Sequence, residues 1–236
     1  MKGLTVMAMM AMSLLIGCTS FGKTAETDTS TAAPKATVEV GEVVIESTLP
    51  TGCVTTIEEL TFPYFVQADD ERLRTDHLVV VRKEARRVML FQNGQLRHDR
   101  AGGAPDCWRI GLGHSPVFDK MVEGDGRTPI GLFRTSDKPW SSFYGAISVH
   151  YPSERHASQA FRAERITKST HDRIVGALKK DSLPPQSTAL GGNILLHGGG
   201  SSSDWTLGCI ALANHDIDEL RGLLPKGMKT WILILP

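Results

Sequence analysis

One cysteine and one histidine near the C-terminus carry the chemistry that the sequence suggests. His197 ends a short apolar run, and Cys209 directly follows Gly208 further along the chain. Because the thiolate is the reactive form of cysteine and a free thiol is mostly protonated at neutral pH, a nucleophilic cysteine needs a nearby base. An imidazole within hydrogen-bond reach can take that proton and return it to a leaving amine. The two residues therefore predict a cysteine nucleophile, Cys209, with His197 as its base.

Glycines beside both residues predict how the site binds a carbonyl and orients the base. Gly208 has no side chain, so a substrate carbonyl can approach the backbone N–H groups of Gly208 and Cys209, which would stabilise a developing oxyanion. No carboxylate in the segment is an obvious partner for His197. We expect a backbone carbonyl, such as that of Gly198, to hold the ring instead.

Two other interpretations compete with a catalytic pair. A lone cysteine or histidine is most often a packed core residue. Zinc ligands are the chemical rival, and His150, His197, Cys209 and His215 are the residues that could supply them. No C-x-x-C or H-x-x-x-H spacing supports such a site. We therefore predict a reaction that uses no metal and no other cofactor.

The surrounding sequence predicts a domain that is mainly β with short helices, in the α+β class. Asn93-Gly94 is a hairpin-turn signal between β-forming segments, and the last apolar segment is expected to be a central strand. The predicted strands, including one edge strand near the N-terminus, cover residues 43–45, 78–81, 88–91, 131–134, 193–196 and 229–235, with a further strand starting at Gln95.

Helical signals are few and short. A short helix is predicted over residues 57–60, and Asn214 is expected to cap another after the cysteine. Residues 153–187 predict a helical insertion with helices over 157–166 and 170–183, the second capped by Thr170. We expect this insertion to pack under the sheet; a lid over the substrate groove is the alternative.

Three segments, taken together, resemble a known enzyme family. Residues 197–210 fit the pattern H-G-x(n)-[ST]-x-G-C-[IV], residues 123–133 read E-G-D-G-R-T-P-I-G-L-F, and residues 148–152 read S-V-H-Y-P. Their order and spacing are similar to the L,D-transpeptidase catalytic domain (YkuD-type) over residues 77–235. The resemblance implies a β-sandwich or sheet with a helical insertion, and thioester chemistry on peptidoglycan stem peptides. It also implies acylation of Cys209 by carbapenems.

The resemblance further implies substrate contacts. It suggests Thr206, Arg127 and Tyr151 as substrate-binding residues, with the segment around Arg127 at the rim of the groove. An arginine there could meet a substrate carboxylate through two parallel hydrogen bonds. An ordinary surface turn is the alternative for that glycine-containing segment.

Two departures from the family pattern leave the direction of the reaction open. Leu207 stands where most members have a second histidine, and Ala211 stands where most have arginine. A sub-branch without that histidine resembles the chain better, and it includes periplasmic enzymes that cut the link between peptidoglycan and a lipoprotein. The expected function is an L,D-transpeptidase that forms cross-links or attaches amine acceptors. A thiol hydrolase of the same fold is the first alternative, and a non-catalytic wall-binding lipoprotein is the second.

The N-terminal residues predict export and anchoring. Residues 1–18 combine Lys2, an apolar run and a lipobox-like end at Cys18, which we expect to be lipidated; an ordinary signal peptide is the alternative. Residues 19–40 have almost no large apolar groups and predict a flexible tether. Residues 41–76 then form an N-terminal extension, and residues 77–236 form the catalytic domain. The expected location is the periplasm of a Gram-negative bacterium, with the lipid anchor in the outer membrane.

Composition and the cysteine count bear on nucleic-acid binding and on disulfide pairing, respectively. The chain has 26 basic and 26 acidic residues, so its net charge of +0 gives no electrostatic basis for binding nucleic acid.

If Cys18 is lipidated and Cys209 is catalytic, Cys53 and Cys107 are the two cysteines that remain. An oxidising periplasm permits a disulfide between them, and two separate buried thiols are the alternative.

Overall fold

The computed structural model of the protein describes residues 49–236, which belong to one compact unit. The predicted signal peptide with Cys18, the tether and the strand at 43–45 lie outside the described residues. No helix within the described part is long and apolar enough to cross a membrane.

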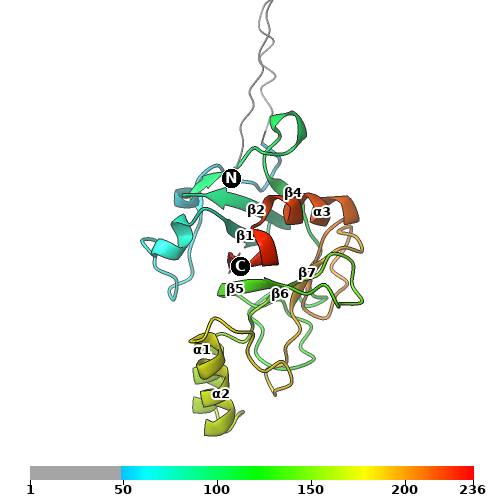
Figure 1. Cartoon of the computed structure of the whole chain (residues 1–236). Coiled ribbons are helices and arrows are strands. Elements are labelled where there is room, and N and C mark those ends of the chain that lie inside the picture. The colour runs from blue at the N-terminus through cyan, green and yellow to red at the C-terminus, as the bar shows by residue number, and fades with distance from the viewer. Residues whose placement is uncertain (1–48) are drawn as a thin grey trace, which may run out of the picture. The chain divides into compact units, whose positions relative to one another are not determined.

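A mixed sheet of nine strands forms the centre of this unit (Figure 1). The strands follow the order β3-β2-β1-β9-β5-β6-β7-β8, and β4 pairs with β2 outside that path. Their bounds are β1 Leu78–Arg82, β2 Arg87–Gln92, β3 Gln95–Leu96, β4 Cys107–Arg109, β5 Gly131–Asp137, β6 Ile147–Val149, β7 Leu195–His197, β8 Ile210–Ala211 and β9 Trp231–Leu235. Most pairs are antiparallel, whereas β1 with β9 and β7 with β8 are parallel.

The last strand is central, as its continuous apolar sequence predicts. β9 lies between β1 and β5, and side chains of a strand alternate between the two faces of the sheet. Ile232 and Ile234 accordingly pack into one hydrophobic core, and Leu233 and Leu235 pack into a second core on the other face. Because both faces are covered, no position of this strand needs a polar side chain.

Three α-helices and four short 3-10 helices complete the described part. The α-helices are α1 Glu154–Arg162, α2 Lys168–Leu178 and α3 Asn214–Leu223, and the 3-10 helices are η1 Ile57–Glu59, η2 Glu71–Arg74, η3 Ala101–Gly103 and η4 Lys226–Met228. The predicted α+β class is confirmed. Helices α1 and α2 lie side by side at one end of the fold (Figure 1). They bury Ala157, Ala160 and Ile174 in the first core, so the insertion packs against the sheet.

Two predicted helix caps were wrong. Helix α2 begins after Thr167, whose hydroxyl accepts from the Thr170 N–H, so Thr170 lies inside the helix. Helix α3 is preceded by Ala213 and has no side-chain cap. The Asn214 side chain is unavailable for capping because its Oδ1 accepts from the Gly199 N–H at 2.9 Å, across the loop that follows β7.

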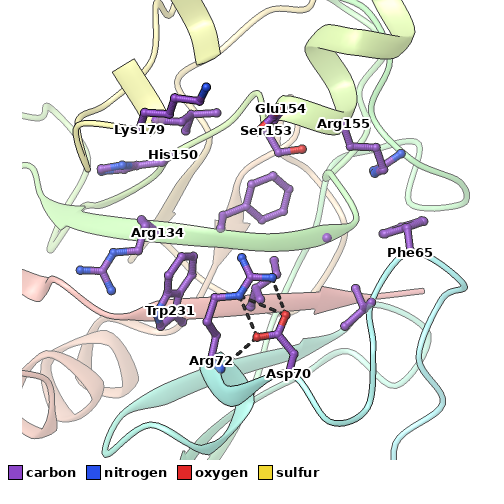
Figure 2. Close-up of a pocket in the computed structure, with 15 residues that line it drawn as sticks. Phe65, Asp70, Arg72, Arg134, His150, Ser153, Glu154, Arg155, Lys179 and Trp231 are labelled. Carbon is purple, nitrogen blue, oxygen red and sulfur yellow. Dashed lines mark hydrogen bonds and ion pairs between the residues drawn. The ribbon is translucent and has the colours of Figure 1, made fainter. Parts of the chain in front are cut away.

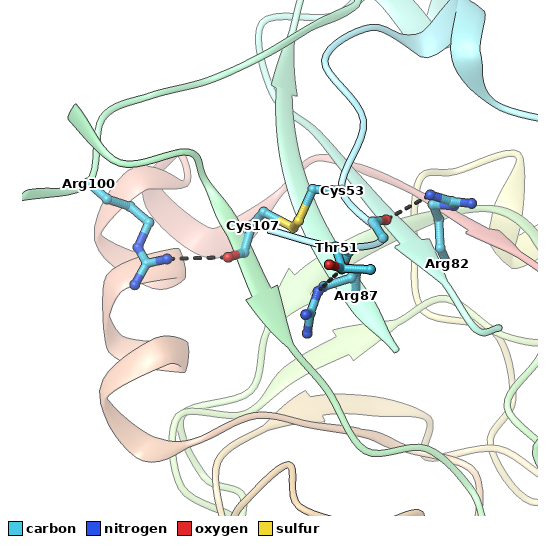
Figure 3. Close-up of a disulfide and its surroundings, with 7 residues drawn as sticks. Thr51, Cys53, Arg82, Arg87, Arg100 and Cys107 are labelled. Atoms are coloured by element: carbon cyan, nitrogen blue, oxygen red, sulfur yellow. Dashed lines mark hydrogen bonds between the residues drawn. A yellow bond between two sulfur atoms is a disulfide. The ribbon is translucent and has the colours of Figure 1, made fainter. Parts of the chain in front are cut away.

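The extension before β1 is fastened to the sheet by a disulfide between Cys53 and Cys107, whose Cα atoms are 6.3 Å apart (Figure 3). The structure therefore contains the disulfide and not two separate buried thiols. Nearby, the Thr51 carbonyl accepts from Arg87 Nε at 2.9 Å, and the Gly52 carbonyl accepts from Arg82 Nη1 at 2.7 Å. Apolar residues of the extension form part of the second core: Cys53, Val54, Ile57, Leu60, Val66 and Leu73.

Replacing both bridged cysteines, as Cys53→Ala/Cys107→Ala, should lower the free energy of unfolding by about 2–4 kcal/mol, because the bridge closes a long loop in the unfolded chain. Urea denaturation of the variant beside the wild type measures this difference. Cys209→Ala is the matched control, since it removes a cysteine and leaves the bridge intact. An unchanged midpoint in the double variant would show that the extension is held by its apolar contacts alone.

Candidate active site

The parallel pair β7–β8 brings His197 and Cys209 together. The register pairs Leu196 with Ile210 and His197 with Ala211, so Cys209 comes one residue before β8, beside Leu195. Side chains two positions apart on a strand point to the same face, and paired residues of adjacent strands share a face. His197 and Cys209 are therefore diagonal neighbours on one face of the sheet.

The His197 ring is held in one orientation. It is buried, and its Nδ1 lies 2.5 Å from the Gly198 carbonyl oxygen, the carbonyl that the sequence analysis suggested. Since a carbonyl accepts, Nδ1 carries the proton and Nε2 is left as the acceptor. The rings of Phe143 and Trp205 flank the imidazole, with centroids 4.5 Å and 5.8 Å away. Burial lowers the pKa of His197, which favours the neutral ring.

Cys209 is the free cysteine of the described residues. Its thiol donates to the Asn193 carbonyl oxygen at 3.4 Å. Burial raises the pKa of the Cys209 thiol, while a hydrogen bond from the Leu195 backbone and the charges of Lys138 and Lys120 lower it in part. With the pKa of His197 also lowered, the resting site holds a neutral thiol beside a neutral imidazole.

The turn before Cys209 is fixed by backbone geometry and by Thr206. Gly208 has φ +131°, and a Cβ at this position would lie 2.6 Å from the Arg127 carbonyl oxygen. The Thr206 hydroxyl accepts from the Gly208 N–H at 3.1 Å and donates to the Cys209 carbonyl at 2.8 Å. The suggested substrate-binding residue Thr206 is thus engaged inside the turn. The Gly208 N–H would have to leave Thr206 to contact an oxyanion.

The other two suggested substrate-binding residues are placed differently. Tyr151 is fully buried, and its hydroxyl donates to the carbonyl of Leu190 at 3.1 Å, so its side chain is closed to a ligand. The Arg127 guanidinium is half-buried, lies 5.6 Å from the Phe118 ring and donates to the Asp119 carbonyl at 3.4 Å. The Arg127 backbone, in contrast, contributes directly to the site, because its carbonyl packs against Gly208.

Sequence reasoning missed four residues of the site. Phe143, Asn193, Lys138 and Trp205 lie around the Cys209–His197 pair. Lys138 and Phe143 come from a distant segment and approach the pair only through the pairing of β5, β6 and β7, whereas Asn193 and Trp205 stand in the same segment of the sequence as His197 and Cys209. The signal available for Asn193 and Trp205 was their closeness in the sequence to His197 and Cys209.

The residues considered as zinc ligands do not converge. His150 Nε2 lies 2.9 Å from the Ser136 hydroxyl, and His215 Nε2 lies 2.9 Å from Asp216 Oδ1 on α3. Within residues 49–236, no group of three or more histidine, cysteine, aspartate or glutamate side chains is close enough to hold a metal ion.

A separate cavity of about 340 Å³ contains His150 but neither member of the pair (Figure 2). Its walls come from the extension, β5, the insertion and β9. The guanidinium groups of Arg72 and Arg134 lie 5.1 Å and 4.8 Å from the Trp231 ring, and Arg72 is also paired with Asp70. The cavity therefore combines charged and aromatic side chains, and it is distinct from the cysteine site.

A family comparison identifies the class of this domain. The model of the L,D-transpeptidase catalytic domain (YkuD) matches residues 76–232, well over half of the chain. The chain therefore belongs to the L,D-transpeptidase catalytic-domain family, whose members are peptidoglycan-acting enzymes, and the predicted membership is confirmed. No curated protein matches the chain.

Solved structures similar to the chain include three from different bacteria. The helical cell shape determining protein Pgp2 (K307A mutant) from Campylobacter jejuni is 22% identical, with a TM-score of 0.45 over 68% of this chain and 47% of that chain. Bd1075 from Bdellovibrio bacteriovorus is 21% identical, with a TM-score of 0.37 over 69% and 48%. An L,D-transpeptidase from Mycobacterium tuberculosis is 10% identical, with a TM-score of 0.38 over 68% and 58%. The chain spans about half of the length of the first two.

Gly208→Ala should destabilise the protein by about 1–3 kcal/mol more than Gly200→Ala, because only the first substitution forces a methyl group against a backbone oxygen. Both glycines have positive φ, +131° and +112°, but a Cβ at Gly200 meets nothing within 4 Å. Urea denaturation of the two variants measures the difference. Equal losses would mean that backbone strain, and not the contact with Arg127, makes glycine necessary.

The rate at which iodoacetamide alkylates Cys209 should rise with pH in a single step centred above the ordinary thiol value. The reason is that burial raises the thiol pKa, so the thiolate forms only at higher pH. Alkylation rates measured between about pH 5 and pH 10 by mass spectrometry test this. A plateau that extends to acidic pH would instead indicate a thiolate–imidazolium pair in the resting enzyme.

Proposed function

We propose that this protein is an L,D-transpeptidase, a cysteine acyltransferase that acts on peptidoglycan stem peptides through a thioester on Cys209. The observation that carries the proposal is the placement of the Cys209 thiol and the His197 ring on one face of β7–β8. The hydrogen bond from Nδ1 to the Gly198 carbonyl supports it further, since it leaves Nε2 free to act as the base.

The first half of the reaction transfers the acyl group to sulfur. His197 Nε2 takes the thiol proton, and the sulfur attacks the carbonyl carbon of the third stem residue, meso-diaminopimelate. The carbon–nitrogen bond to the terminal D-alanine then breaks. The leaving amine takes the proton from His197, and an acyl thioester remains on Cys209.

The second half releases the acyl group to an acceptor. An incoming amine loses its proton to His197 and attacks the thioester carbon, and the carbon–sulfur bond breaks. The sulfur then recovers the proton from His197. The amine can come from another stem peptide, from a lipoprotein lysine or from a free D-amino acid.

Leu207 favours hydrolysis as a second candidate function. The side chain at this position, where most family members carry a second histidine, is 78% exposed and adds no polar group near the thioester. Water could then replace the amine as acceptor, which would make the protein a thiol hydrolase that trims stem peptides or releases a lipoprotein.

We propose that the protein acts in the periplasm, anchored through a lipid on Cys18. The lipobox-like end of residues 1–18 supports this location, and so does the Cys53–Cys107 disulfide, because such bonds persist in oxidising compartments. Metabolic labelling with radioactive palmitate tests it. The label should be lost in Cys18→Ala, and a wild-type protein without label would refute the anchor.

Intact mass spectrometry of the protein with purified disaccharide-tetrapeptide tests the reaction. We expect an adduct on Cys209, none in Cys209→Ala, and formation that is about 10²- to 10⁴-fold slower in His197→Gln, since general-base catalysis contributes that much. Dimeric or amino-acid-exchanged muropeptides would establish the transpeptidase, and hydrolysed tripeptide alone would establish the hydrolase. Folded protein without an adduct or turnover would refute both and favour a wall-binding role.

A further inference from the structure

The cavity that contains His150 has an excess of positive charge in its wall. Its charged residues are four cations, Arg72, Arg134, Arg155 and Lys179, and two carboxylates, Asp70 and Glu154. The apolar part of the wall includes Phe65, Leu132, Phe133, Leu178 and Trp231. A volume of about 340 Å³ is within the usual range for a small-molecule site, and such sites combine an apolar wall with a few polar groups.

Two of these cations flank the Trp231 ring (Figure 2). Each guanidinium is fixed by a carboxylate through Nε and Nη2, Arg72 by Asp70 and Arg134 by Asp181. Within the described part of the chain, the Nη1 atom of neither arginine has a hydrogen-bond partner. The guanidinium groups are therefore held in place, and each keeps N–H donors for a further acceptor.

The His150 ring supplies a separate indication of a ligand. Its side chain is only 3% exposed, and its Nδ1 is buried without a hydrogen-bond partner among the residues that the structure describes. Burial lowers the pKa of His150 to about 4, so the ring is neutral at pH 7. When the Ser136 hydroxyl donates to Nε2, at 2.9 Å, the ring proton is on Nδ1. Buried polar atoms are nearly always paired, so an unpaired N–H in a cavity wall marks a position for a ligand acceptor.

Lys179 contributes a cation that no carboxylate neutralises. The ion pairs around the cavity engage Arg72, Arg134 and Arg155, and within residues 49–236 none engages Lys179. The lysine is exposed at the end of α2, so its ammonium can reach an entering ligand. Positive charge that is not offset in the wall of a hollow attracts anions.

We propose that this cavity binds a small organic anion in which a carboxylate is attached to an apolar group. The carboxylate accepts from the His150 Nδ1–H, from Lys179 and from the free arginine Nη1 groups, and the apolar group packs on the aromatic and aliphatic wall. Charge-assisted hydrogen bonds suit a carboxylate, and the apolar wall favours a ligand that also has apolar surface to bury. The cavity contains neither Cys209 nor His197, so this binding is separate from the proposed thioester chemistry.

Three probes test the two parts of the proposed ligand: N-acetyl-phenylalanine, its carboxamide and acetate. The readout is the dissociation constant from the NMR shift of the Trp231 indole N–H in the full-length protein, with the signal assigned through Trp231→Phe. We expect the acid to bind about 10-fold more tightly than the carboxamide, because hydrogen bonds to charged groups contribute at least that much. Acetate should bind about 10-fold more weakly than the acid, because it has no aromatic ring to bury.

Equal dissociation constants for the acid and the carboxamide would overturn the anion site, and equal constants for the acid and acetate would overturn its apolar part. A shift of the Trp205 indole N–H in place of that of Trp231 would assign the binding to the cysteine site and also overturn the proposal. None of these outcomes depends on a reaction at Cys209, so each leaves the proposed transpeptidase as it stands.

Two variants with a matched control identify the groups that bind the anion. Lys179→Met and His150→Phe should each weaken binding of the acid by about 10-fold and leave the carboxamide unchanged. Lys180→Met is the control, because it removes the neighbouring exposed lysine, which is not part of the cavity wall. Wild-type affinity for the acid in both Lys179→Met and His150→Phe, or an equal loss in Lys180→Met, would overturn the proposal.

Discussion

The parallel pairing of β7 with β8 is the constraint on which the site depends. β8 has only two residues, Ile210 and Ala211, and a shift of its register by one residue would turn Cys209 to the opposite face from His197. Long-range backbone bonds hold the register. Gly111 exchanges two hydrogen bonds of 2.8 Å with Ala211, and the Leu212 N–H donates to the His197 carbonyl at 2.8 Å. These backbone hydrogen bonds therefore fix where Cys209 and His197 stand relative to each other on the sheet.

Glycines make this close backbone packing possible. The Arg127 carbonyl occupies the space beside Gly208, and the Ser203 carbonyl occupies the space beside Gly111, where a Cβ would lie 2.2 Å from it. Segments distant in the sequence thus meet at the nucleophile without side chains between them. The loop after β7 is held in a similar way, since the Gly199 N–H binds Asn214 Oδ1 at the start of α3.

The electrostatics of the site follow from burial. Desolvation raises the pKa of Cys209 and lowers that of His197, so both groups are neutral at rest and charge develops only when a substrate carbonyl is attacked. The charges of Lys120 and Lys138 lower the pKa of Cys209 in part, and the two lysines differ in their partners. Lys120 is paired with Asp125, whereas Lys138 donates to the uncharged Asn193 side chain.

Local patterns in the sequence were enough to predict the Cys209–His197 pair, the main strands and the family. These patterns are apolar alternation, turn residues, and a histidine and a cysteine set among glycines. The sequence also suggested Gly198 as the partner of His197, because imidazole Nδ1–H often donates to a nearby backbone carbonyl. The features that depend on contacts between distant segments became visible only in the tertiary structure. It joined Cys53 to Cys107, buried Tyr151, bound the Asn214 side chain to the Gly199 N–H, and placed Lys138 against the Asn193 side chain. The physical reason is that strand register and side-chain burial are fixed only when segments far apart in the chain pack together.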